Sequence, residues 1–472
     1  MTMHRYLLVV PDGVGIRNFF CTRMVERLLE TGTVCVWHAL PETSIAPFAR
    51  RWGGRVRWEE LPPSRDGLAE RLFRQAKIMA QLYWQMKKGP DVQLRRRRPP
   101  SAWKTRLLYF AARAMGYCCA GPRRIVWLDR MHQRQASRGP HMGAFLSFLK
   151  AERPDVLFCT HQRALEAVPA MLAAKKLGIP SAVFIYSWDN LPKGRMAVYA
   201  DIYVVWSEHM KRELLGFYPD VSPSRVRVVG TPQFENYFNA SLRLPREEFF
   251  AGLGLDVKRP LVCFSGNDIT SPFDPQFLED LASGLLAVPL PERPQILFRR
   301  SPVDTTNRFD DVLRRHPEIA VSDPRWQRVR EGEWSQLVPT EEDGALLVNV
   351  VAHSDAVVNV GSTMGMDFAI FDKPAIYIDY NPAGMEKIWN IHDVYRLPHF
   401  APVLALQPVH WARSRDELGP VVMHALRNRG EKKEARRAWL EMIVQPPLEG
   451  ASGRFAAELE RIAGNGRSGP AA

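Results

Sequence analysis

The sequence predicts an α/β protein with two doubly wound, Rossmann-like domains, each built on a parallel sheet. Its 472 residues exceed what one hydrophobic core usually organises. Short apolar segments rich in Val, Ile and Phe alternate with helical segments along most of the chain. The stretch 353–380 also reads as a complete strand–helix–strand unit, and such a crossover requires two parallel strands.

Within that stretch, the apolar run Ala356–Val360 predicts a buried strand that ends at Gly361. An apolar stripe with helical spacing follows over 364–371, and the next predicted strand is Ala375–Ile378. The helix therefore begins at the carboxyl end of a parallel strand, which is the edge at which open α/β sheets bind ligands.

The turn between this strand and helix has the features of a phosphate site. The first N–H groups of a helix lack partners within it and carry the positive end of its dipole. Gly361 allows close approach of the backbone, Ser362 and Thr363 supply hydroxyl groups, and Asp367 can accept hydrogen bonds from ribose hydroxyls. Alternatively, Ser362 and Thr363 cap the helix and Asp367 is solvated, and the turn by itself favours neither interpretation.

The chain opens with the same alternation of elements. Arg5–Val10 predicts a strand, Asn18–Glu30 a helix and Thr33–His38 the next strand. The connecting segment Pro11–Gly15 lacks the third glycine of a dinucleotide fingerprint, so it predicts a flexible wall for a ligand or an ordinary turn. Residues 66–150 have mostly helical patterning, and we interpret them as an insertion in the first domain.

Further predicted elements continue the alternation to the C-terminus. In the first domain they are the strands Asp155–Thr160, Ala182–Tyr186, Ile202–Trp206 and Arg225–Gly230 and the helices Ala164–Leu177 and Glu208–Leu215. In the second they are the strands Leu261–Phe264 and Gln295–Phe298 and the helices Asp343–His353, Arg415–Asn428 and Glu431–Ile443, and the helix Gly453–Ile462 follows the second domain. The expected organisation is a first domain over 1–238, a second over 239–440, C-terminal helices over 441–465 and a disordered tail over 466–472.

Positive charge is concentrated in one block. Between Arg95 and Lys150 there are 13 Lys or Arg residues and one acid, Asp129, whereas the whole chain has a formal net charge of +13. The block begins with four consecutive arginines, 95–98, and continues into an apolar and aromatic helical segment. Such a helix is typical of proteins that lie on anionic membranes. We expect membrane contact and no nucleic-acid contact, since no nucleic-acid-binding module is recognisable; a solvated helical face is the third interpretation.

Composition narrows the cellular setting. No apolar run approaches the ~20 residues that span a bilayer. Tyr6–Val10 is too short for the apolar region of a signal peptide. The six cysteines show neither CxxC spacing nor nearby histidine pairs, so we expect no metal site and no disulfide framework. The predicted location is the cytoplasm, with peripheral contact at the inner membrane face.

Several segments together resemble the GT-B glycosyltransferases, in particular the branch that builds bacterial surface polysaccharides. They are SWDNLPKGR at 187–195, VVWSEHMKREL at 204–214, VVGTPQFENY at 228–237 and VGSTMGMDFAIFDKPAIYID at 360–379. FRRSPVD at 298–304 is similar to the Arg-x-x-Pro segment of that branch and of the CDP-glycerol glycerophosphotransferase-like enzymes of teichoic-acid synthesis. The resemblance spans most of residues 150–380, whereas the first 150 residues match only through the opening strand and PDGVGIRNF.

The resemblance implies a GT-B fold, in which two Rossmann-like domains face a central cleft. It implies that the N-terminal domain binds the acceptor, that the C-terminal domain binds the nucleotide sugar, and that the last helix crosses back to the first domain. It further implies metal-independent transfer without a cofactor, because the nucleotide sugar is a substrate. The expected function is a glycosyltransferase of cell-surface glycan biosynthesis, acting on a lipid-linked or polysaccharide acceptor.

Such a transfer needs positive charge at the leaving diphosphate. Arg300, at the carboxyl end of a predicted strand, is the expected cation, because Arg299 would alternate to the other face of the strand. Ser265 and Gly266 are expected to add a second backbone wall to the donor site. A surface ion pair is the alternative role for Arg300.

The transfer also needs a base for the acceptor hydroxyl. Asp189, Asp12 and His161 each follow a predicted strand of the first domain. Asp189 is preferred and Asp12 is second, while the histidine type suits proton transfer near neutral pH. Each of the three can instead be an ordinary turn residue. We expect the acceptor side to be lined by Gly13, Gly15, Asn18, Trp188 and Asn190. For Trp389, His392 and Tyr395, packing in the core or at the surface is the favoured role, and lining of the cleft is the alternative.

Three other functions stay open. A CDP-polyol phosphotransferase of teichoic-acid type is suggested by the segment RRSPVD, 299–304. A nucleotide-sugar 2-epimerase has the same fold but needs several carboxylates around the sugar, and the sequence does not identify them. The last is a non-catalytic GT-B-like scaffold that binds a membrane or a partner protein.

Overall fold

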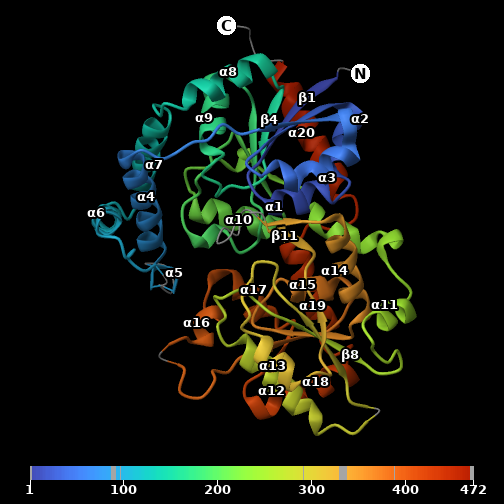
Figure 1. Cartoon of the computed structure of the whole chain (residues 1–472). Helices are drawn as coiled ribbons and strands as arrows, with labels where there is room; N and C mark the ends of the chain where they lie inside the picture. The colour runs from blue at the N-terminus through green and yellow to red at the C-terminus, as the bar shows by residue number, and fades with distance from the viewer. Residues whose placement is uncertain are drawn as a thin grey trace. The chain divides into compact units, whose positions relative to one another are not determined.

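A computed structural model describes residues 3–86, 92–95, 97–290, 292–328, 337–386 and 388–467. The chain divides into two compact units. The first unit comprises Met1–Gln233, Val329–Val338 and Ile443–Ala472, and the second comprises Phe234–Arg328 and Pro339–Met442. Each unit contains one parallel sheet with helices packed around it (Figure 1). The predicted α/β class with two doubly wound sheets is thereby confirmed.

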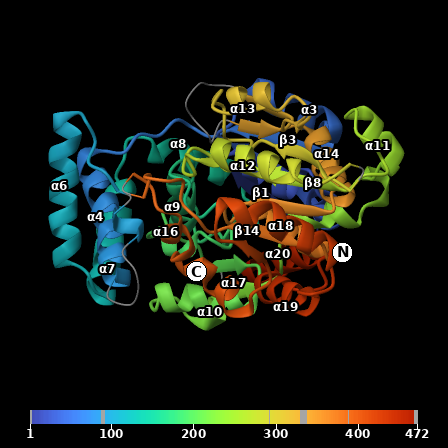
Figure 2. The same ribbon diagram turned by 90° about the horizontal axis from the view of Figure 1, so that it is seen from below.

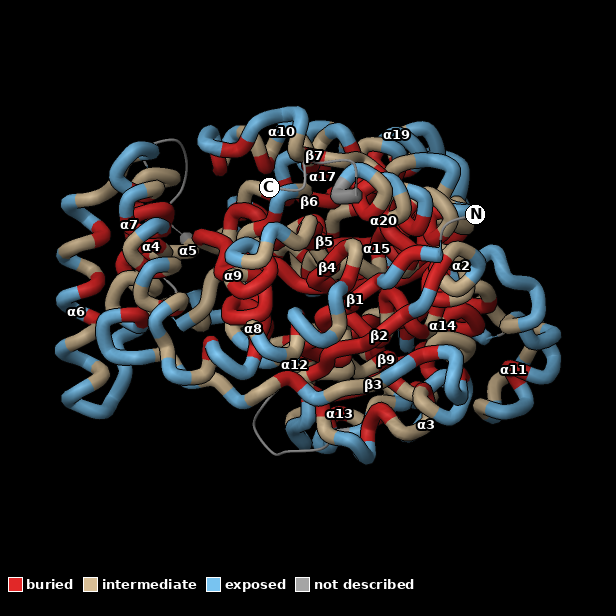
Figure 3. Tube along the Cα trace, turned by 90° about the horizontal axis from the view of Figure 1, so that it is seen from above, coloured by how far each residue is buried: buried red, intermediate tan, exposed pale blue. Residues whose placement is uncertain are grey.

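The first unit contains a seven-stranded sheet in the order β3-β2-β1-β4-β5-β6-β7, with every neighbouring pair parallel. The strands are β1 (His4–Val10), β2 (Gly32–His38), β3 (Val56–Glu60), β4 (Val156–Cys159), β5 (Ser181–Phe184), β6 (Ile202–Val205) and β7 (Val226–Val228). The central strands are almost wholly buried, as expected for parallel strands covered on both faces (Figure 3).

The strand order reverses between β1 and β4. The chain passes from β1 outward to β2 and β3, and then returns to place β4 and the later strands on the other side of β1. Connections that leave two adjacent parallel strands in opposite directions open a crevice at their carboxyl ends. The residues after Val10 and after Cys159 lie at this switch point.

The helices of the first unit are α1 (Gly13–Gly15), a π-helical turn (Ile16–Phe20), α2 (Met24–Thr31), α3 (Glu42–Trp52), α4 (Leu68–Met86), α5 (Val92–Arg95), α6 (Trp103–Cys118), α7 (Pro122–Ala136), α8 (Met142–Glu152), α9 (Val168–Lys176), α10 (Glu208–Phe217) and α20 (Ala451–Arg467). The continuous helix expected over 18–30 is wrong. The Cys21 N–H donates to the Ile16 carbonyl five positions earlier at 3.2 Å, which is π-helical bonding, and the Thr22 hydroxyl donates to the carbonyl oxygens of Asn18 and Phe19. The π-helical turn therefore ends before α2 begins.

Helices α4, α6 and α7 form a group with its own small core within the first unit. Both α6 and α7 pack against α4 (Figure 2). Ala76, Ala80, Ala112, Ile125 and Leu128 are buried between these helices. The charged block that starts at 95–98 begins in α5, but residue 96 and the side chain of residue 95 lie outside the described part of the chain.

The chain returns to the first unit with α20, which packs against α2, β1 and β4. Phe455 of α20 lies among Phe19, Phe158 and Phe184, with ring centroids 5.2, 5.1 and 5.4 Å away. These edge-to-face contacts anchor the helix in the aromatic core. Of the expected tail 466–472, residues 466 and 467 belong to α20 and the others lie outside the described residues.

The second unit contains a six-stranded parallel sheet in the order β10-β9-β8-β13-β14-β15, which reverses between β8 and β13. The strands are β8 (Leu261–Ser265), β9 (Gln295–Arg299), β10 (Ala320–Ser322), β13 (Ala356–Asn359), β14 (Ala375–Ile378) and β15 (His410–Ala412). The short strands β11 (Trp326–Arg328) and β12 (Leu337–Pro339) lie outside this sheet. The switch point therefore lies at the carboxyl ends of β8 and β13, which are Ser265 and Asn359.

The helices that begin in the second unit are α11 (Arg246–Gly252), α12 (Asp274–Leu286), α13 (Asp310–Arg315), α14 (Glu341–His353), α15 (Met364–Ile370), α16 (Ile391–Tyr395), α17 (Ala401–Leu406), α18 (Arg415–Arg427) and α19 (Lys433–Ile443). Within the described ranges, no helix is both long and apolar enough to cross a bilayer.

Candidate functional site

A buried carboxylate–imidazole pair lies at the switch point of the first sheet. Asp12 follows β1 and His161 follows β4, and a carboxylate oxygen of Asp12 contacts Nδ1 of His161 directly. The other carboxylate oxygen accepts a hydrogen bond from the Gly15 N–H at 3.1 Å, so Asp12 also caps the helical turn α1. Both side chains are buried.

The surroundings of Asp12 keep it ionised. Burial alone would raise the pKa of Asp12, but the charge and hydrogen bond of His161 and the N–H groups of Gly15 and Val14 lower it. A carboxylate that holds Nδ1–H of an imidazole leaves Nε2 as the nitrogen that accepts a proton. The pair thus has the chemistry of a general base with an orienting carboxylate.

The segment after β5 joins the same corner of the first sheet. The Tyr186 ring packs edge-on against the His161 ring, with centroids 4.0 Å apart and planes at 72°. The pKa of Tyr186 is raised to about 12, mainly by burial, and the charges of Asp189 and Asp12 contribute to this increase. Residues that follow three neighbouring strands, Asp12 after β1, His161 after β4 and Tyr186 after β5, are therefore in contact through His161.

Asp189, the base preferred from the sequence, lies in a different environment. It forms an ion pair with Lys193 and accepts hydrogen bonds from Ser187 Oγ at 2.6 Å and Asn190 Nδ2 at 3.0 Å. The cation and the two donors therefore occupy both oxygens of the Asp189 carboxylate. Neighbouring Trp188 is only 3% exposed.

Residues expected to line the acceptor side have largely structural contacts. A Cβ on Gly15 would lie 2.6 Å from Thr160 Oγ1, and one on Gly13 would lie 1.9 Å from the carbonyl oxygen of Leu337, which belongs to the same unit. The segment 11–15, for which a flexible wall or an ordinary turn was expected, therefore contains a tightly packed helical turn, Gly13–Gly15. Asn190 accepts a hydrogen bond from Arg163 Nη1 at 3.1 Å.

Asn18 is the exception among these residues. It is fully buried, and its Oδ1 accepts a hydrogen bond from Arg17 Nε at 3.1 Å. Its Nδ2 has no hydrogen-bond partner among the residues that the structure describes. A buried donor without an acceptor is costly, so this amide is a candidate contact for a polar ligand.

The turn after β13 has the backbone conformation that glycine permits. Gly361 has φ of +60°, and a Cβ on it would lie 2.6 Å from Phe400 Cζ and 3.2 Å from Tyr395 Cε1. The Ser362 N–H donates to Asn359 Oδ1 at 2.9 Å, and the Ser362 hydroxyl accepts from the Met364 N–H at 3.4 Å. Part of the hydrogen-bonding capacity expected for a phosphate is thus used within the turn.

The other predicted donor residues also have protein partners. Thr363 precedes the first residue of α15, and Asp367 accepts a hydrogen bond from the Tyr237 hydroxyl at 2.8 Å. Arg300 donates to Asp323 Oδ1 and to the Thr306 carbonyl, both at 3.0 Å. The side chain of Asp323 is 60% exposed, so this ion pair lies at the surface of the second unit.

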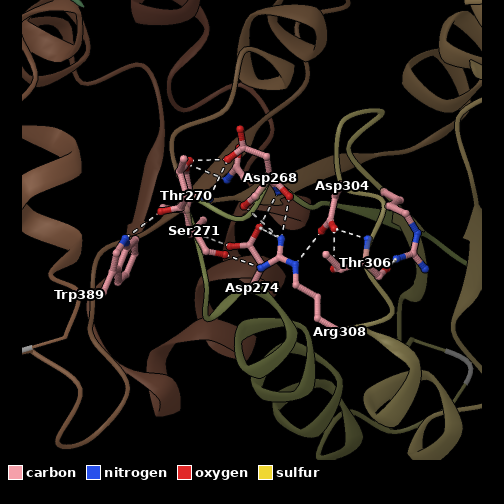
Figure 4. Close-up of polar contacts among 11 residues, drawn as sticks. Asp268, Thr270, Ser271, Asp274, Asp304, Thr306, Arg308 and Trp389 are labelled. Carbon is pink, nitrogen blue, oxygen red and sulfur yellow. Dashed lines mark hydrogen bonds and ion pairs between the residues drawn. The ribbon is translucent and has the colours of Figure 1, made fainter. Parts of the chain in front are cut away.

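The loop after β8 is held by a polar network that the sequence did not reveal (Figure 4). Arg308 donates to Asp304 Oδ2 at 2.6 Å, to the Ser271 carbonyl at 2.6 Å and to the Asn267 carbonyl at 2.8 Å. Asp274 accepts from the Asn267 N–H at 2.6 Å, and burial raises its pKa to about 6. The available sequence signal was that these charges lie in the segments that follow two predicted strands, Leu261–Phe264 and Gln295–Phe298.

This network connects the two sides of the second switch point. Ser265 is buried at the end of β8, and the Gly266 N–H donates to the Arg299 carbonyl at 3.0 Å. Asn267 Nδ2 donates to the carbonyl of Val360 at 3.0 Å, next to Gly361. The loop after β8 and the turn after β13 are therefore fixed relative to each other.

A cavity of about 320 Å³ lies near the carboxyl ends of β14 and β15. Its lining residues are Asp379, His392, Tyr395, Arg396, Leu404, Gln407, Trp411 and Arg413. Tyr395 lies beside Gly361 and donates to the Ile378 carbonyl at 2.6 Å, so it joins the turn to the cavity. Trp389 instead donates to the Thr270 carbonyl at 3.0 Å (Figure 4).

One group of potential metal ligands was found within the described ranges. His410, His424 and Glu431 bring their ligand atoms within 4.8 Å of one another. His410 is the first residue of β15, so the group lies at the amino edge of the sheet, away from the carboxyl edge that carries Gly361.

No protein-family model and no curated protein matches the sequence. The structure is nevertheless similar to solved structures over nearly its whole length. UDP-GlcNAc 2-epimerase from Neisseria meningitidis, bound to UDP-GlcNAc, is 10% identical with a TM-score of 0.50, over 97% of this chain and 100% of that one. Another UDP-N-acetylglucosamine 2-epimerase is 10% identical with a TM-score of 0.53, over 98% and 97%. TcCGT1 in complex with UDP is 12% identical with a TM-score of 0.50, over 98% and 100%.

These similarities establish the fold. With the two parallel sheets, they show that the chain has the GT-B fold of enzymes that act on nucleotide sugars. The comparisons do not single out the CDP-glycerol glycerophosphotransferase-like branch.

Proposed function

We propose that the protein is a glycosyltransferase that moves a sugar from a nucleotide-sugar donor to an acceptor hydroxyl. The observation that carries this proposal is the buried Asp12–His161 pair at the first switch point of a GT-B fold. Nε2 of His161 takes the acceptor proton, while Asp12 orients the ring and stabilises the imidazolium that forms. The acceptor oxygen bonds to the anomeric carbon as the bond from that carbon to the diphosphate oxygen breaks.

The donor is proposed to bind at the switch point of the second sheet. There the loop after β8 and the turn at Gly361 are tied together by Asn267. Arg300 would stabilise the charge of the leaving diphosphate, with the phosphate displacing exposed Asp323 from its guanidinium group. The chain's own cations and backbone dipoles thus take the role that a divalent metal has in other transferases.

The acceptor is proposed to be a lipid-linked or polysaccharide chain of cell-surface glycan biosynthesis. A lipid-linked acceptor would be met at the cytoplasmic face of the inner membrane. The basic block between Arg95 and Lys150 is the part of the chain that we propose to contact that surface.

Thermal unfolding of the full chain in the presence of nucleotides tests the donor proposal. UDP and UDP-sugars are the first ligands, followed by CMP, GDP and dTDP compounds and by CDP-glycerol. A nucleotide at 100 times its Kd should add about 2.7 kcal/mol to the free energy of unfolding and raise Tm. Absence of protection by every compound would refute the proposal, and protection by CDP-glycerol alone would favour the polyol phosphotransferase.

A nucleotide-sugar 2-epimerase is the second candidate, because two of the similar structures are 2-epimerases. Asp12 and Asp189, which both act on Tyr186, would be the carboxylates available near the sugar. Incubation with UDP-GlcNAc in D2O without an acceptor distinguishes the two reactions. Exchange of the C2 proton in NMR spectra would support the epimerase, and an unchanged C2 proton is expected for the transferase.

A further inference from the structure

Helix α6 presents an apolar face to solvent. Trp103, Leu107, Phe110 and Tyr117 are 67%, 63%, 47% and 68% exposed. Ala111, Ala114 and Cys118 are exposed as well. Large apolar side chains at the surface are ordinary when scattered, but a contiguous set marks a contact surface.

These side chains share one side of the helix. At about 100° per residue, positions 103, 107, 110, 111, 114, 117 and 118 fall within an arc of about 120°. The opposite side carries Tyr109, Ala112 and Gly116, which are buried. That side packs on α4, where a Cβ on Gly116 would lie 2.5 Å from Met79 Cβ. Helix α6 therefore has two apolar faces, one against α4 and one outward. Exposed residues recur along α6 in Figure 3.

Basic side chains flank the outward face on both sides. By the same spacing, Lys104 lies at one border of the arc, and Arg106 and Arg113 lie at the other. Lys104 Nζ is 5.5 Å from the centroid of the Trp103 ring, and Arg106 Cζ is 5.9 Å from that of Phe110. Long basic side chains beside aromatic rings can keep their charge at the headgroup level while the rings enter the apolar layer.

Negative charge is absent from the outward side of this part of the chain. Helix α6 has no Asp or Glu, and Asp129 is the only acid between Arg95 and Lys150. Asp129 is buried, where its carboxylate accepts from Arg195 Nε at 2.7 Å and pairs with Lys77 Nζ at 3.2 Å. No carboxylate of the block is therefore exposed to repel an anionic surface.

Helix α7 has a second exposed stripe that also combines basic and aromatic side chains. Arg123, Trp127, Arg130 and Arg134 recur with helical spacing and are exposed, Trp127 to 48%. Helices α6 and α7 both pack on α4, so the two stripes belong to one group of helices.

We propose that the outward face of α6, from Trp103 to Tyr117, docks on the surface of an anionic lipid bilayer and inserts its aromatic side chains at the interface. The charge pattern favours a bilayer over a second copy of the chain. Two α6 faces in contact would bring their bordering cations together with no acid to compensate. This inference depends on α6 and its neighbours alone, and it holds for any reaction that the two switch points perform.

Sedimentation of the full-length protein with vesicles tests the proposal. We expect binding to phosphatidylcholine vesicles that contain phosphatidylglycerol, weak binding to phosphatidylcholine alone, and release by added salt. Leu107→Glu and Phe110→Glu should each weaken binding to the anionic vesicles at least about tenfold, because a charge replaces an inserting side chain. Leu290→Glu is the matched control, since Leu290 is 63% exposed like Leu107 but lies in the second unit.

Equal binding by the Leu107→Glu and Leu290→Glu proteins would overturn the proposal, as would equal binding to neutral and anionic vesicles. A dimer in solution that Leu107→Glu dissociates, without vesicle binding by the parent protein, would assign the face to a second copy instead. Nucleotide protection measured on the same variants separates the two proposals. It should be unchanged in Leu107→Glu, and its absence in a parent protein that still binds vesicles would refute only the transferase.

Discussion

Asp12 and His161 are 149 positions apart in the sequence, yet the carboxylate of one contacts Nδ1 of the other. The contact exists because β1 and β4 are neighbouring parallel strands, with Val9 in register with Cys159. Both residues follow their strands at the point where the strand order reverses. An open α/β sheet binds its ligands at this position.

The first prediction concerns the proton acceptor. Replacement of His161 by Ala should lower kcat by about 10²- to 10⁴-fold, because the acceptor hydroxyl loses its base. Asp12→Asn should also lower kcat, since the amide cannot hold His161 as the carboxylate does. Initial rates are measured with the nucleotide sugar that protects the protein from thermal unfolding.

Asp189→Asn is the matched variant for this experiment, because Asp189 also follows a strand of the first sheet but is paired with Lys193. We expect it to retain most of kcat. A full loss in Asp189→Asn together with an active His161→Ala protein would reverse the assignment. Nucleotide protection should persist in all three variants, which distinguishes lost chemistry from lost folding.

The second prediction concerns the backbone of the turn after β13. Gly361→Ala should destabilise the protein by about 2–4 kcal/mol, because φ of +60° is unfavourable for Ala and its Cβ would meet Phe400 at 2.6 Å. Gly384→Ala is the control, since Gly384 has φ of +77° but no atom within 4 Å of the added Cβ. Denaturant unfolding of both variants separates the backbone cost from the steric cost. Equal destabilisation of the Gly361→Ala and Gly384→Ala proteins would show that the Phe400 ring moves away from the added methyl group at little cost.

The third prediction concerns the network around Arg308. Arg308→Ala should cost about 3 kcal/mol, because it leaves the buried Asp304 carboxylate without its cation. It should also raise the pKa of Asp274, which burial already raises to about 6 and which Arg308 lowers. A carboxyl group whose pKa is raised in the folded protein lowers the free energy of unfolding as pH rises, because the folded state disfavours its ionised form. The variant should therefore be more destabilised, relative to the parent protein, at about pH 8 than at about pH 5. Urea unfolding at the two pH values measures this difference.

Arg315→Ala is the control for Arg308. Arg315 also binds a carboxylate, Glu279, at 2.6 Å, but its side chain is 58% exposed. Its loss should change the free energy of unfolding little, because exposed ion pairs contribute little. An Arg308→Ala protein as stable as Arg315→Ala at both pH values would contradict the structural role of the network. Nucleotide protection of the two variants shows whether the β8 loop serves the donor.

The sequence was informative wherever the pattern was local. The apolar run and the break at Pro374 located β14 at its observed bounds, and Gly361 lies in the turn that was expected after the preceding strand, β13. The three-residue strands β10 and β15 were missed, because three residues are too few to show a period of two. The helical turn at Gly13 was not predicted, because its two glycines suggested a flexible wall or an ordinary turn, although Asp12 is a favoured N-cap residue.

Contacts between residues that are far apart in the sequence could not be predicted from the local pattern of apolar and polar residues. Asp12 and His161 were both identified as candidates, but only the strand order brings them together. Asp189 was preferred because it lies in a polar turn, whereas Lys193 four positions later forms an ion pair with it. The basic block predicted a surface helix. Which face of α6 is exposed depends on how it packs against α4, and neighbouring sequence does not determine this.

The last prediction concerns Glu213 of α10. Burial raises the pKa of this carboxyl from 4.5 to about 8, and the nearest ion-pair partner, His209, is 3.7 Å away at Nε2. Between those two values the unfolded chain releases a proton that the folded chain keeps, so the free energy of unfolding falls as pH rises from 4.5 to about 8. Glu213→Gln removes this pH-dependent destabilisation and should be more stable than the parent protein by about 4 kcal/mol near pH 8, with little difference near pH 4. Glu208→Gln, five positions earlier on the same helix and exposed, should show no such gain, and equal pH profiles for the two variants would mean that Glu213 is ionised in the folded protein.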